Sequence, residues 1–241
     1  MKFYIAIPVY KAEAFLSECV SSVLSQTCQD FEIVLVDDGS PDGTAAIVKE
    51  QQRVYPGSLH LIERSGKLGL GTAYLAGFRW ALENGYDYVF EMDCDFSHNP
   101  DDLVRLSQAA VAGADLVIGS RYVTGVNVVN WPMKRVLMSY YASAYVRFVT
   151  GMPVRDATAG FVCYSAKLLR TMDMDAVRMK GYGFQVEMKY TAWKLGFRVK
   201  EVPIIFTERT LGASKMSGGI FREAFFGVLK LRFRSIKPKA V

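Results

Sequence analysis

The stretch Val34-Leu35-Val36-Asp37-Asp38-Gly39-Ser40-Pro41-Asp42-Gly43-Thr44 joins an apolar run to a polar, periodic segment through a short acidic turn. The apolar run predicts a strand that is buried on both faces, and the glycines, proline and aspartates that follow are typical turn residues. Ser40 or Asp42 can cap the helix that starts after the turn. The stretch therefore predicts the strand, turn and helix from which α/β sheets are built.

The same unit recurs on both sides of this stretch. Short apolar runs predict strands, longer periodic segments predict helices, and Gly, Pro, Asn or Asp separate them. We expect strands at 2–9, 31–37, 58–63, 87–92 and 115–119, and helices at 12–26, 43–55, 71–84 and 100–112. This alternation predicts an α/β fold with a Rossmann-like, mostly parallel central sheet that is flanked by helices.

The pattern changes after Arg121. An aromatic-rich helix is expected at 132–149, followed by short mixed elements up to Phe206 and a last helix near 217–235. We find no linker, low-complexity tract or internal repeat. We therefore expect a catalytic domain and a C-terminal basic amphipathic helix, with bounds of 1–216 (a nucleotide-binding half, 1–120, and an acceptor half, 121–216) and 217–241.

Composition narrows the class of protein. About half of the 241 residues are apolar, and the four cysteines show no C-x-x-C spacing, which favours reduced thiols in the cytoplasm over a secreted disulfide framework. No run of eighteen apolar residues lacks a charge, so we expect no membrane-spanning helix. The net charge is +5, but residues 209–241 hold eight Lys or Arg and one Glu, so all the excess positive charge is C-terminal.

Asp93 and Asp95 stand two residues apart where the apolar run Tyr88-Val89-Phe90 gives way to a loop. Carboxylate oxygens are hard ligands that suit Mg²⁺ and Mn²⁺, and Mg²⁺ usually shares its shell with waters and a substrate diphosphate. Such aspartates can also cap the next helix, but the run Asn-Pro-Asp-Asp at 99–102 can supply that cap instead. We therefore expect Asp93 and Asp95 to hold a divalent cation and a phosphorylated ligand.

Other polar residues follow predicted strands, and ligands of such sheets lie beyond the carboxyl ends of the strands. Those expected to converge there are Tyr10, Asp37, Asp38, Asp93, Asp95 and Arg121. Asp37 and Asp38 can accept hydrogen bonds from a ribose hydroxyl or a base N–H, whereas Asp42 fits a structural cap. His60 and His98 are far apart in sequence and form no zinc motif, so both are interpreted as structural.

Basic residues offer contacts for phosphate. Arg64 and Lys67 precede the predicted N-terminus of a helix, where free N–H groups favour anions, although the glycine pattern is not that of a P-loop. Arginine forks match phosphate oxygens, and each candidate can equally be an ordinary surface charge. The further candidates are Arg121, Arg135, Arg209 and Lys215.

With these residues assembled, the chain resembles the GT-A glycosyltransferases of sequence family two, and most closely the polyprenyl (dolichyl) phosphate mannosyltransferases. The motifs that carry the resemblance span nearly the whole chain. They are IPVY (7–10), VDDGSPDGT (36–44), GLGTAY (69–74), MDCDFSHNP (92–100), GSRY (119–122), WPMKR (131–135), DATAGF (156–161), GFQVEM (183–188) and FTERTLGASKM (206–216). The last is the most specific, because general glycosyltransferases share the first half of the chain but not this ending.

The resemblance implies roles for individual residues. The nucleoside is expected to contact Pro8, Tyr10, Val36 and Asp38. The diphosphate and the Mg²⁺ or Mn²⁺ ion are expected at Asp93, Cys94 and Asp95. The residues expected to act in catalysis, by binding the ion, phosphates or the sugar, are Asp95, Arg121, Arg209 and Lys215. The acceptor phosphate is expected at Arg121, Arg135 and Ser214.

The chain departs from the family pattern at two places. Lys11 and Ala12 replace the usual Asn and Glu, with Glu13 one place late, which leaves the choice of nucleotide base open. Ser97 stands where some members have a Gln metal ligand, so water can complete the shell of the ion there.

No residue is a convincing general base, which a sugar hydroxyl acceptor would need. A lipid phosphate would not need one, because a phosphomonoester already carries about −1.5 to −2 charges at neutral pH. The metal and the basic loop would stabilise the departing nucleoside diphosphate. Glu187, in a helix expected near 184–196, is the reserve candidate for a base or a sugar contact.

We therefore expect an inverting, metal-dependent transferase that moves mannose from GDP-mannose to polyprenyl phosphate, peripheral at the cytoplasmic face of the membrane. Its expected partners are a nucleotide sugar, the lipid phosphate and the membrane surface, and not nucleic acid. The C-terminal helix, with aromatic and basic residues, is the first candidate for membrane contact, and the helix at 132–149 is the second. Either helix can instead close the core.

Three alternatives stay open. The donor can be a UDP-sugar such as UDP-glucose, or the acceptor can be soluble or a polysaccharide. In the third alternative the chain is an inactive, membrane-associated nucleotide-binding protein.

Overall fold

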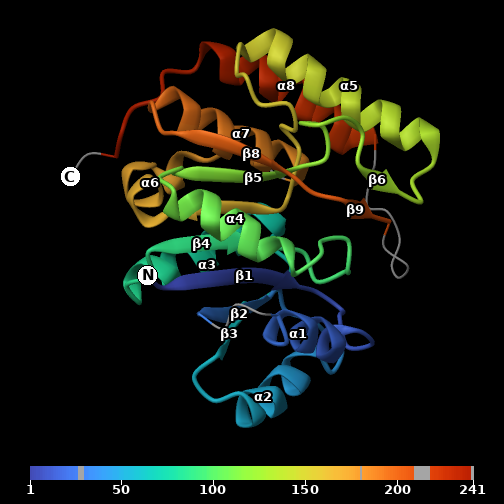
Figure 1. Cartoon of the computed structure of the whole chain (residues 1–241), viewed down its shortest axis with the longest axis vertical. Helices are drawn as coiled ribbons and strands as arrows, with labels where there is room; N and C mark the ends of the chain where they lie inside the picture. The colour runs from blue at the N-terminus through green and yellow to red at the C-terminus, as the bar shows by residue number, and fades with distance from the viewer. Residues whose placement is uncertain (27–29, 180, 209–217, 240–241) are drawn as a thin grey trace.

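The computed structural model describes residues 1–26, 30–179, 181–208 and 218–239. Its centre is a seven-stranded sheet in the order β3-β2-β1-β4-β7-β5-β8, drawn in Figure 1. Its strands are β1 (Phe3–Val9), β2 (Phe31–Asp37), β3 (Leu59–Glu63), β4 (Tyr88–Glu91), β5 (Leu116–Ser120), β7 (Val162–Ser165) and β8 (Val199–Pro203). A second, two-stranded sheet pairs β6 (Val128–Val129) with β9 (Phe206–Thr207).

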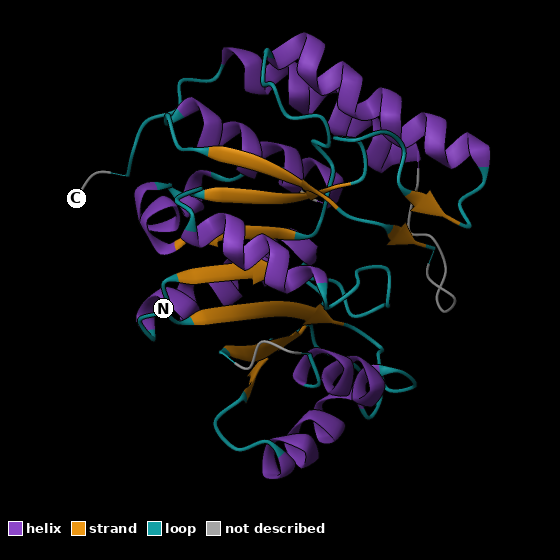
Figure 2. Ribbon diagram, viewed as in Figure 1, coloured by secondary structure: helices purple, strands orange, loops and turns teal. Residues whose placement is uncertain are grey.

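The predicted mostly parallel sheet is confirmed, with one reversal. β7 is antiparallel to both β4 and β5, while the remaining pairs of the large sheet are parallel. Figure 2 shows that the parallel strands point towards one edge, where β6 and β9 also lie. Because the carboxyl ends of parallel strands meet at one edge, the loops after β1, β2, β4 and β5 share that side of the molecule.

Helices cover both faces of the sheet. They are α1 (Leu16–Leu24), α2 (Thr44–Val54), α3 (Leu70–Glu83), α4 (Asp102–Val111), α5 (Met133–Thr150), α6 (Ala166–Thr171), α7 (Gly181–Lys194) and α8 (Gly218–Phe233), with a 3₁₀ turn at Met174–Ala176. The helix predicted from residue 12 begins only at Leu16, because the chain first turns at Lys11, whose φ is +56°. The helix predicted from residue 100 begins at Asp102.

Alternation along β1 divides the core in two. Ile5 and Ile7 face α1, α2 and α4, whereas Tyr4 and Ala6 face α3 and α7 on the other side of the sheet. All four side chains are fully buried. Burial on both faces explains why the strands read as continuous apolar runs in the sequence.

The turn after β2 is held by two contacts that its sequence anticipates. Asp42 Oδ1 accepts hydrogen bonds from the Thr44 N–H (3.2 Å) and hydroxyl (2.6 Å), which gives it a structural role in the turn before α2, whose N-cap residue is Gly43. Gly39 has φ +71°, and a Cβ there would lie 2.6 Å from the Gly66 Cα. Only glycine therefore fits where the β2–α2 turn meets the loop that leads to α3.

α5 and α8 pack on each other and form an outer layer, in which α8 packs on α7 (Figure 1). Val228 and Leu231 of α8 are buried in the core, and Tyr145 of α5 stacks on Phe225 with ring centroids 4.8 Å apart. The C-terminal helix, predicted as a separate element, is thus an integral part of the packing. Among the described helices, none is long and apolar enough to cross a membrane.

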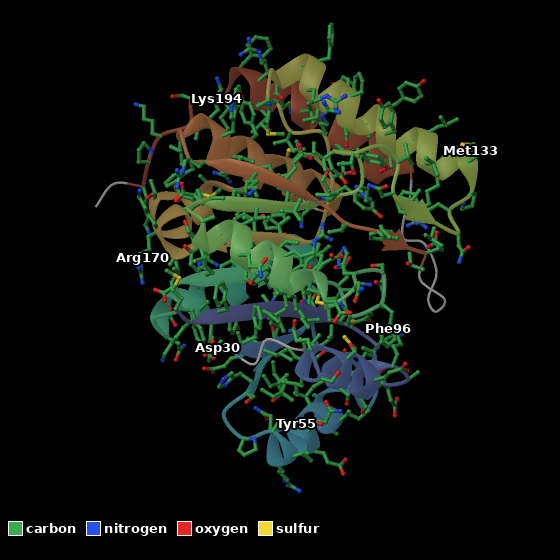
Figure 3. The ribbon with its side chains drawn as sticks, viewed as in Figure 1. Asp30, Tyr55, Phe96, Met133, Arg170 and Lys194 are labelled. Atoms are coloured by element: carbon green, nitrogen blue, oxygen red, sulfur yellow. The ribbon has the colours of Figure 1, made fainter. Side chains whose placement is uncertain are left out.

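Both helices of this layer also expose apolar side chains, which we call the α5/α8 face. Its members are Met133, Leu137, Tyr140, Tyr141 and Phe148 of α5, and Phe225, Phe226 and Phe233 of α8. The five α5 residues fall on one stripe of the helix at a period of 3.6 residues. Phe148 is 90% exposed and Phe233 is 87% exposed. Figure 3 marks Met133 at the outer end of α5.

Glu187, on α7, holds the segment that follows α8. Its side chain is buried, its Oε2 accepts the backbone N–H groups of Arg178 (2.9 Å) and Met179 (2.7 Å), and its Oε1 pairs with Arg234. Arg234 also donates to the Ala176 carbonyl. Glu187 is therefore fully engaged in joining α7, the 174–179 segment and the chain after α8, which corrects its interpretation as a reserve base or sugar ligand.

Replacing Glu187 with Ala should lower the free energy of unfolding by about 3 kcal/mol, because two partly buried backbone N–H groups and Arg234 lose their buried acceptor. The matched control is Glu63→Ala, which removes the exposed Glu63–Lys49 pair and should cost less than about 1 kcal/mol. Urea unfolding followed by circular dichroism measures both. Equal losses in the two variants would show that Glu187 is not an anchor.

Candidate active site

The loop after β4 carries Asp93 and Asp95, and neighbouring side chains orient both. The hydroxyl of Tyr74, on α3, donates to Asp93 Oδ1 at 3.1 Å. Burial raises the pKa of Tyr74 well above its ordinary value, so this hydroxyl stays protonated and acts as the donor. Ser97 donates its N–H (3.2 Å) and its hydroxyl (2.6 Å) to Asp95 Oδ1. Ser97 therefore orients a predicted metal ligand.

The buried side chain of His98 holds the backbone of the same loop. Its Nδ1 accepts the Asp93 N–H at 3.2 Å, its ring stacks on Phe161 (4.9 Å between centroids), and it meets the ring of Phe206 edge-on. Burial lowers the pKa of His98 to about 4, so the imidazole is neutral near pH 7. A neutral ring that accepts at Nδ1 carries its proton on Nε2. The contacts agree with the interpretation of His98 as a structural residue.

The start of helix α4 is held by residues other than Asp93 and Asp95, as expected. Asn99 Oδ1 accepts the Asp101 N–H at 3.1 Å, and the Asn99 carbonyl accepts the Asp102 N–H at 3.1 Å. Asp93 and Asp95 do not cap this helix, whose N-cap residue is Asp101. Cys94, between them, is half-buried against the core, and burial raises the pKa of its thiol, so it stays protonated.

Arg121, at the end of β5, is locked in a buried ion pair with Asp156. Its Nε and Nη2 donate to the two carboxylate oxygens at 2.7 and 2.6 Å, and its backbone N–H adds a third bond at 2.9 Å. Nη2 also donates to the Thr158 hydroxyl at 2.9 Å. Although burial acts to raise the pKa of Asp156, the charge and hydrogen bonds of Arg121 outweigh it and hold that pKa below its ordinary value.

Glu201, on β8, supports this ion pair. Its carboxylate accepts the N–H groups of Arg155 (2.8 Å) and Asp156 (2.9 Å) and the hydroxyl of Ser120 (2.7 Å). The loop that carries Asp156 is thus fixed to the ends of β5 and β8. This junction leaves Arg121 little freedom to move.

Arg135, on the first turn of α5, lies beside the same site. Its Cζ stands 4.2 Å from the centroid of the Trp131 ring, and its guanidinium pairs with Glu208. The Arg121 guanidinium lies 5.5 Å from the Trp131 ring and 5.5 Å from the Phe206 ring. Two arginines predicted to bind phosphate therefore share one aromatic wall.

A cavity of about 460 Å³ joins these groups. Its polar end is formed by Asp93, Asp95, Ser97, His98, Arg121, Thr158, Arg135 and Glu208. Its apolar walls come mainly from α5 and α8, through Met138, Tyr141, Ala142, Tyr145, Val146, Ala224, Phe225 and Val228. The cavity therefore leads from a pair of carboxylates and two guanidinium groups into the layer that bears the α5/α8 face.

The donor set at the polar end suits a hard divalent cation. Asp93 and Asp95 supply carboxylate oxygens on the cavity wall, and the described residues contain no cluster of three or more His, Cys, Asp or Glu that could enclose a metal. Two carboxylates fit an ion that completes its shell with waters and a substrate diphosphate. They do not fit a structural zinc site, which needs four protein ligands.

Behind the loop runs a buried polar network. Gln185 of α7 donates to Glu91 Oε2 at 2.7 Å, and Lys189 donates to Gln185 Oε1 at 3.1 Å and to the Ala159 carbonyl at 2.7 Å. Burial raises the pKa of Glu91 and lowers that of Lys189. The network ties α7 to β4 directly below Asp93. The sequence does not reveal it, because its members are far apart along the chain.

The residues predicted to contact the nucleoside lie at or just beyond the carboxyl ends of β1 and β2. Pro8 and Val36 are register partners in those strands, and Val36 is buried in the core, so only its backbone can meet a ligand. Tyr10 is half-buried, with Lys67 Nζ 4.2 Å from the centroid of its ring. These residues share the sheet edge with Asp93 but do not line the cavity.

The carboxylate of Asp38 accepts hydrogen bonds from other protein groups in this structure. It accepts from Arg64 Nη1 (2.7 Å) and from the N–H groups of Leu68 (3.3 Å) and Gly69 (3.2 Å). Asp37 likewise accepts the Ser40 N–H at 3.1 Å. The observed role of Asp38 is to hold the loop before α3, and its predicted nucleoside contact stays a prediction.

Some predicted site residues lie outside the described part of the chain, namely Arg209, Ser214 and Lys215. Glu13, one place later than the family position, accepts the Gly43 N–H at 3.3 Å, so it serves the start of α2. Functional groups that the sequence reasoning did not single out are Tyr74, Trp131, Asp156, Thr158 and Glu208. Each lies in or beside a quoted motif, and the signal that could have drawn attention to Asp156 is a lone acid in an otherwise apolar or small motif.

Comparison with known proteins agrees with this geometry. The Glycosyl transferase family 2 domain matches residues 4–177. A "Polyprenol monophosphomannose synthase" of Mycolicibacterium smegmatis is 47% identical over 236 residues, which cover 98% of this chain and 89% of the relative. An "Undecaprenyl-phosphate mannosyltransferase" of Micrococcus luteus is 49% identical over 207 residues, covering 86% of this chain and 84% of the relative.

Solved structures share the architecture at low identity. Glucosyl-3-phosphoglycerate synthase from Mycobacterium tuberculosis, solved in complex with Mn²⁺, UDP-glucose and phosphoglyceric acid, superposes with a TM-score of 0.69 at 18% identity. The match covers 96% of this chain and 79% of that chain. It supports the fold alone, and the expected GT-A architecture is confirmed. By the extent of the domain match and the identity of its relatives, this chain belongs to glycosyl transferase family 2.

Proposed function

We propose that this protein is a polyprenyl-phosphate mannosyltransferase that uses GDP-mannose and a divalent cation, Mg²⁺ or Mn²⁺, at the cytoplasmic surface of a membrane. The observation that carries the proposal is the single cavity in which two carboxylates and two arginines open onto apolar walls. The names of the two relatives, each nearly half identical to this chain, support the same acceptor and sugar.

The polar end suits a reaction between two phosphorylated ligands. Asp93 and Asp95 would hold the cation, which, when bound, neutralises the diphosphate of the departing nucleotide. Arg121 gives its Nε and Nη2 to Asp156 and Thr158, so it would offer Nη1 to a phosphate, and Arg135, which pairs with Glu208, would offer its guanidinium beside it. A phosphate oxygen would form a bond to the anomeric carbon as the bond from that carbon to the nucleoside diphosphate breaks, so the configuration inverts.

The carboxylates that line the cavity in the described part of the chain have other assignments: Asp93 and Asp95 are the proposed metal ligands, and Glu208 pairs with Arg135. Glu187 is saturated by hydrogen bonds outside the cavity, and His98 already accepts at Nδ1 from the Asp93 N–H. A phosphomonoester needs no base, because it is ionised at neutral pH. These observations favour a phosphate acceptor over a sugar hydroxyl.

The α5/α8 face supports a location at the lipid surface. The same two helices also expose basic side chains, namely Lys134, Lys230 and Arg232. Exposed aromatic groups together with basic side chains suit insertion at an anionic membrane surface. Side chains of the same two helices line the cavity, so a lipid acceptor bound there would lie next to this face.

The proposal is tested with purified protein, Mn²⁺, short-chain polyprenyl phosphate and a panel of labelled sugar nucleotides. We expect labelled mannose to pass from GDP-mannose to the lipid, with at most trace transfer from UDP-glucose. Preferred use of UDP-glucose would overturn the assignment of the donor. Failure of every donor to label the lipid would overturn the function.

Asp95→Ala should lower the turnover rate at least about a hundredfold while the fold is retained, because the site loses a ligand to the ion that stabilises the leaving group. Asp101→Ala, which removes an exposed carboxylate near the same loop, is the control and should retain activity. Chelation of divalent cations should silence the wild type, with recovery on added Mn²⁺. Undiminished turnover by Asp95→Ala would remove the metal assignment.

The membrane contact is tested on α8 without deleting it, since Val228 and Leu231 belong to the core. Phe226→Ser with Phe233→Ser should weaken sedimentation with anionic vesicles by roughly tenfold, because two exposed aromatic side chains no longer enter the interface. Val54→Ser, on the exposed end of α2, should bind as the wild type does. Unchanged sedimentation of the double variant would leave the α5/α8 face without this role.

A further inference from the structure

The two nitrogens of the His98 ring have different surroundings. Nδ1 accepts the Asp93 N–H at 3.2 Å, so the ring proton is on Nε2. No residue in the described part of the chain accepts a hydrogen bond from this Nε2–H. His98 is 2% exposed and lines the cavity, and its Nε2 is not among the unpartnered side-chain atoms that are sealed from solvent. The Nε2–H is therefore a donor that the fold holds in place at the cavity wall.

Open space lies next to this edge of the ring. A Cβ built on Gly160, which also lines the cavity, would lie 3.8 Å from His98 Cε1 and 3.8 Å from Asp93 Oδ2. Apart from the chain neighbours of Gly160, no other described atom is within 4 Å of that position. Cε1 is bonded to Nε2, so a ligand that fills this space would lie within reach of the Nε2–H.

His98 lies between the two groups of side chains that the proposed function assigns to phosphates. On one side it contacts the backbone of Asp93, a proposed ligand of the ion at the departing diphosphate. On the other side it meets the Phe206 ring, whose centroid is 5.5 Å from the Arg121 guanidinium. The anomeric carbon of the transferred sugar bonds first to the diphosphate and then to the acceptor phosphate. The sugar must therefore lie between these two groups, beside His98.

An uncharged N–H suits a sugar hydroxyl. The phosphates of both ligands have charged partners in the proposed site, namely the cation and the two arginines, whereas the hydroxyl oxygens of a sugar carry no charge. A buried donor that a ligand leaves unpaired weakens the binding of that ligand. A site with such a donor therefore favours a sugar that places an oxygen against it, and it rejects an analogue that lacks this oxygen.

We propose that the Nε2–H of His98 donates to a hydroxyl oxygen of the transferred sugar, which makes His98 a specificity-determining residue. The inference rests on the proposed function. It gives the two nitrogens separate roles, since Nδ1 holds the loop and Nε2 recognises the sugar. Two substitutions separate these roles, because the amide oxygen of Asn can take the place of Nδ1 and the amide nitrogen of Gln can take the place of Nε2.

Donor binding without an acceptor tests the proposal. GDP, GDP-mannose and the monodeoxy analogues of GDP-mannose, each of which lacks one sugar hydroxyl, are titrated calorimetrically into the protein with Mn²⁺. The wild type should bind at least one analogue roughly three- to tenfold more weakly than GDP-mannose, because the Nε2–H loses its acceptor.

His98→Asn should bind GDP-mannose more weakly by a similar factor, and it should no longer distinguish that analogue from GDP-mannose. Its affinity for GDP, which has no sugar, should be that of the wild type. His98→Gln should keep the distinction between the two sugars. The control is His60→Asn, which changes a histidine paired with Glu32 away from the cavity and should match the wild type throughout.

Gly160→Ala tests the same space without altering His98. The added methyl group makes only ordinary contacts with the described residues, and the backbone of Gly160 does not need glycine. This variant should keep the affinity for GDP. It should bind GDP-mannose at least about tenfold more weakly, because the methyl group occupies space that the sugar needs.

An equal loss of GDP and GDP-mannose affinity in His98→Asn would overturn the proposal, because the ring would then serve the diphosphate or the loop alone. Losses that multiply for every deoxy analogue would also overturn it, as would wild-type affinity of Gly160→Ala for GDP-mannose. If the wild type shows the expected discrimination but transfers no mannose to lipid, the proposed function fails while the role of His98 in sugar recognition stands.

Discussion

The buried ion pair between Arg121 and Asp156 is the interaction on which the site depends. It joins the end of β5 to the loop before β7, and Glu201 of β8 holds that loop from the other side. A buried pair is stable only when its hydrogen bonds are satisfied, and here the two carboxylate oxygens of Asp156 receive three bonds from Arg121. The pair thereby fixes a guanidinium against the aromatic wall of Trp131 and Phe206.

The reversed strand β7 accounts for the position of Asp156. β7 runs between β4 and β5, so the chain must arrive at the active edge before it enters β7, and the arriving loop carries Asp156 and Thr158. The parallel strands bring Asp93, Asp95 and Arg121 to the same edge by their carboxyl ends. The site is therefore built from strand ends on one side and from the loop into β7 on the other.

The cavity combines two kinds of surface that rarely meet in a globular core. Its polar end presents carboxylates and arginines, while α5 and α8 supply apolar walls and continue outward as the exposed α5/α8 face. An amphiphile with a phosphate head matches both surfaces at once. That match, more than the aspartates alone, supports a lipid phosphate as the proposed acceptor.

Much of the fold could be predicted from the sequence, because each parallel strand is buried on both faces and reads as a continuous apolar run. The place of β7 could not, since four apolar residues do not encode the direction of a strand or its distant partners. Asp93 and Asp95 were predicted from strand-end position, but the partners of Arg121 and Arg135 were not, because Asp156 and Glu208 lie 35 and 73 residues away from them. The pattern of α8 favoured membrane contact over core packing, whereas Val228 and Leu231 are buried in the core and Phe226 and Phe233 are exposed.

The most direct test of the central claim compares two acceptors that differ only in the phosphate. Polyprenyl phosphate and the corresponding free polyprenol are offered at equal concentration in the same detergent, with GDP-mannose and Mn²⁺. If arginines bind the acceptor phosphate and no residue acts as a general base, as we propose, only the phosphorylated lipid should be glycosylated. Comparable transfer of mannose to the free alcohol would contradict a phosphate-binding acceptor site.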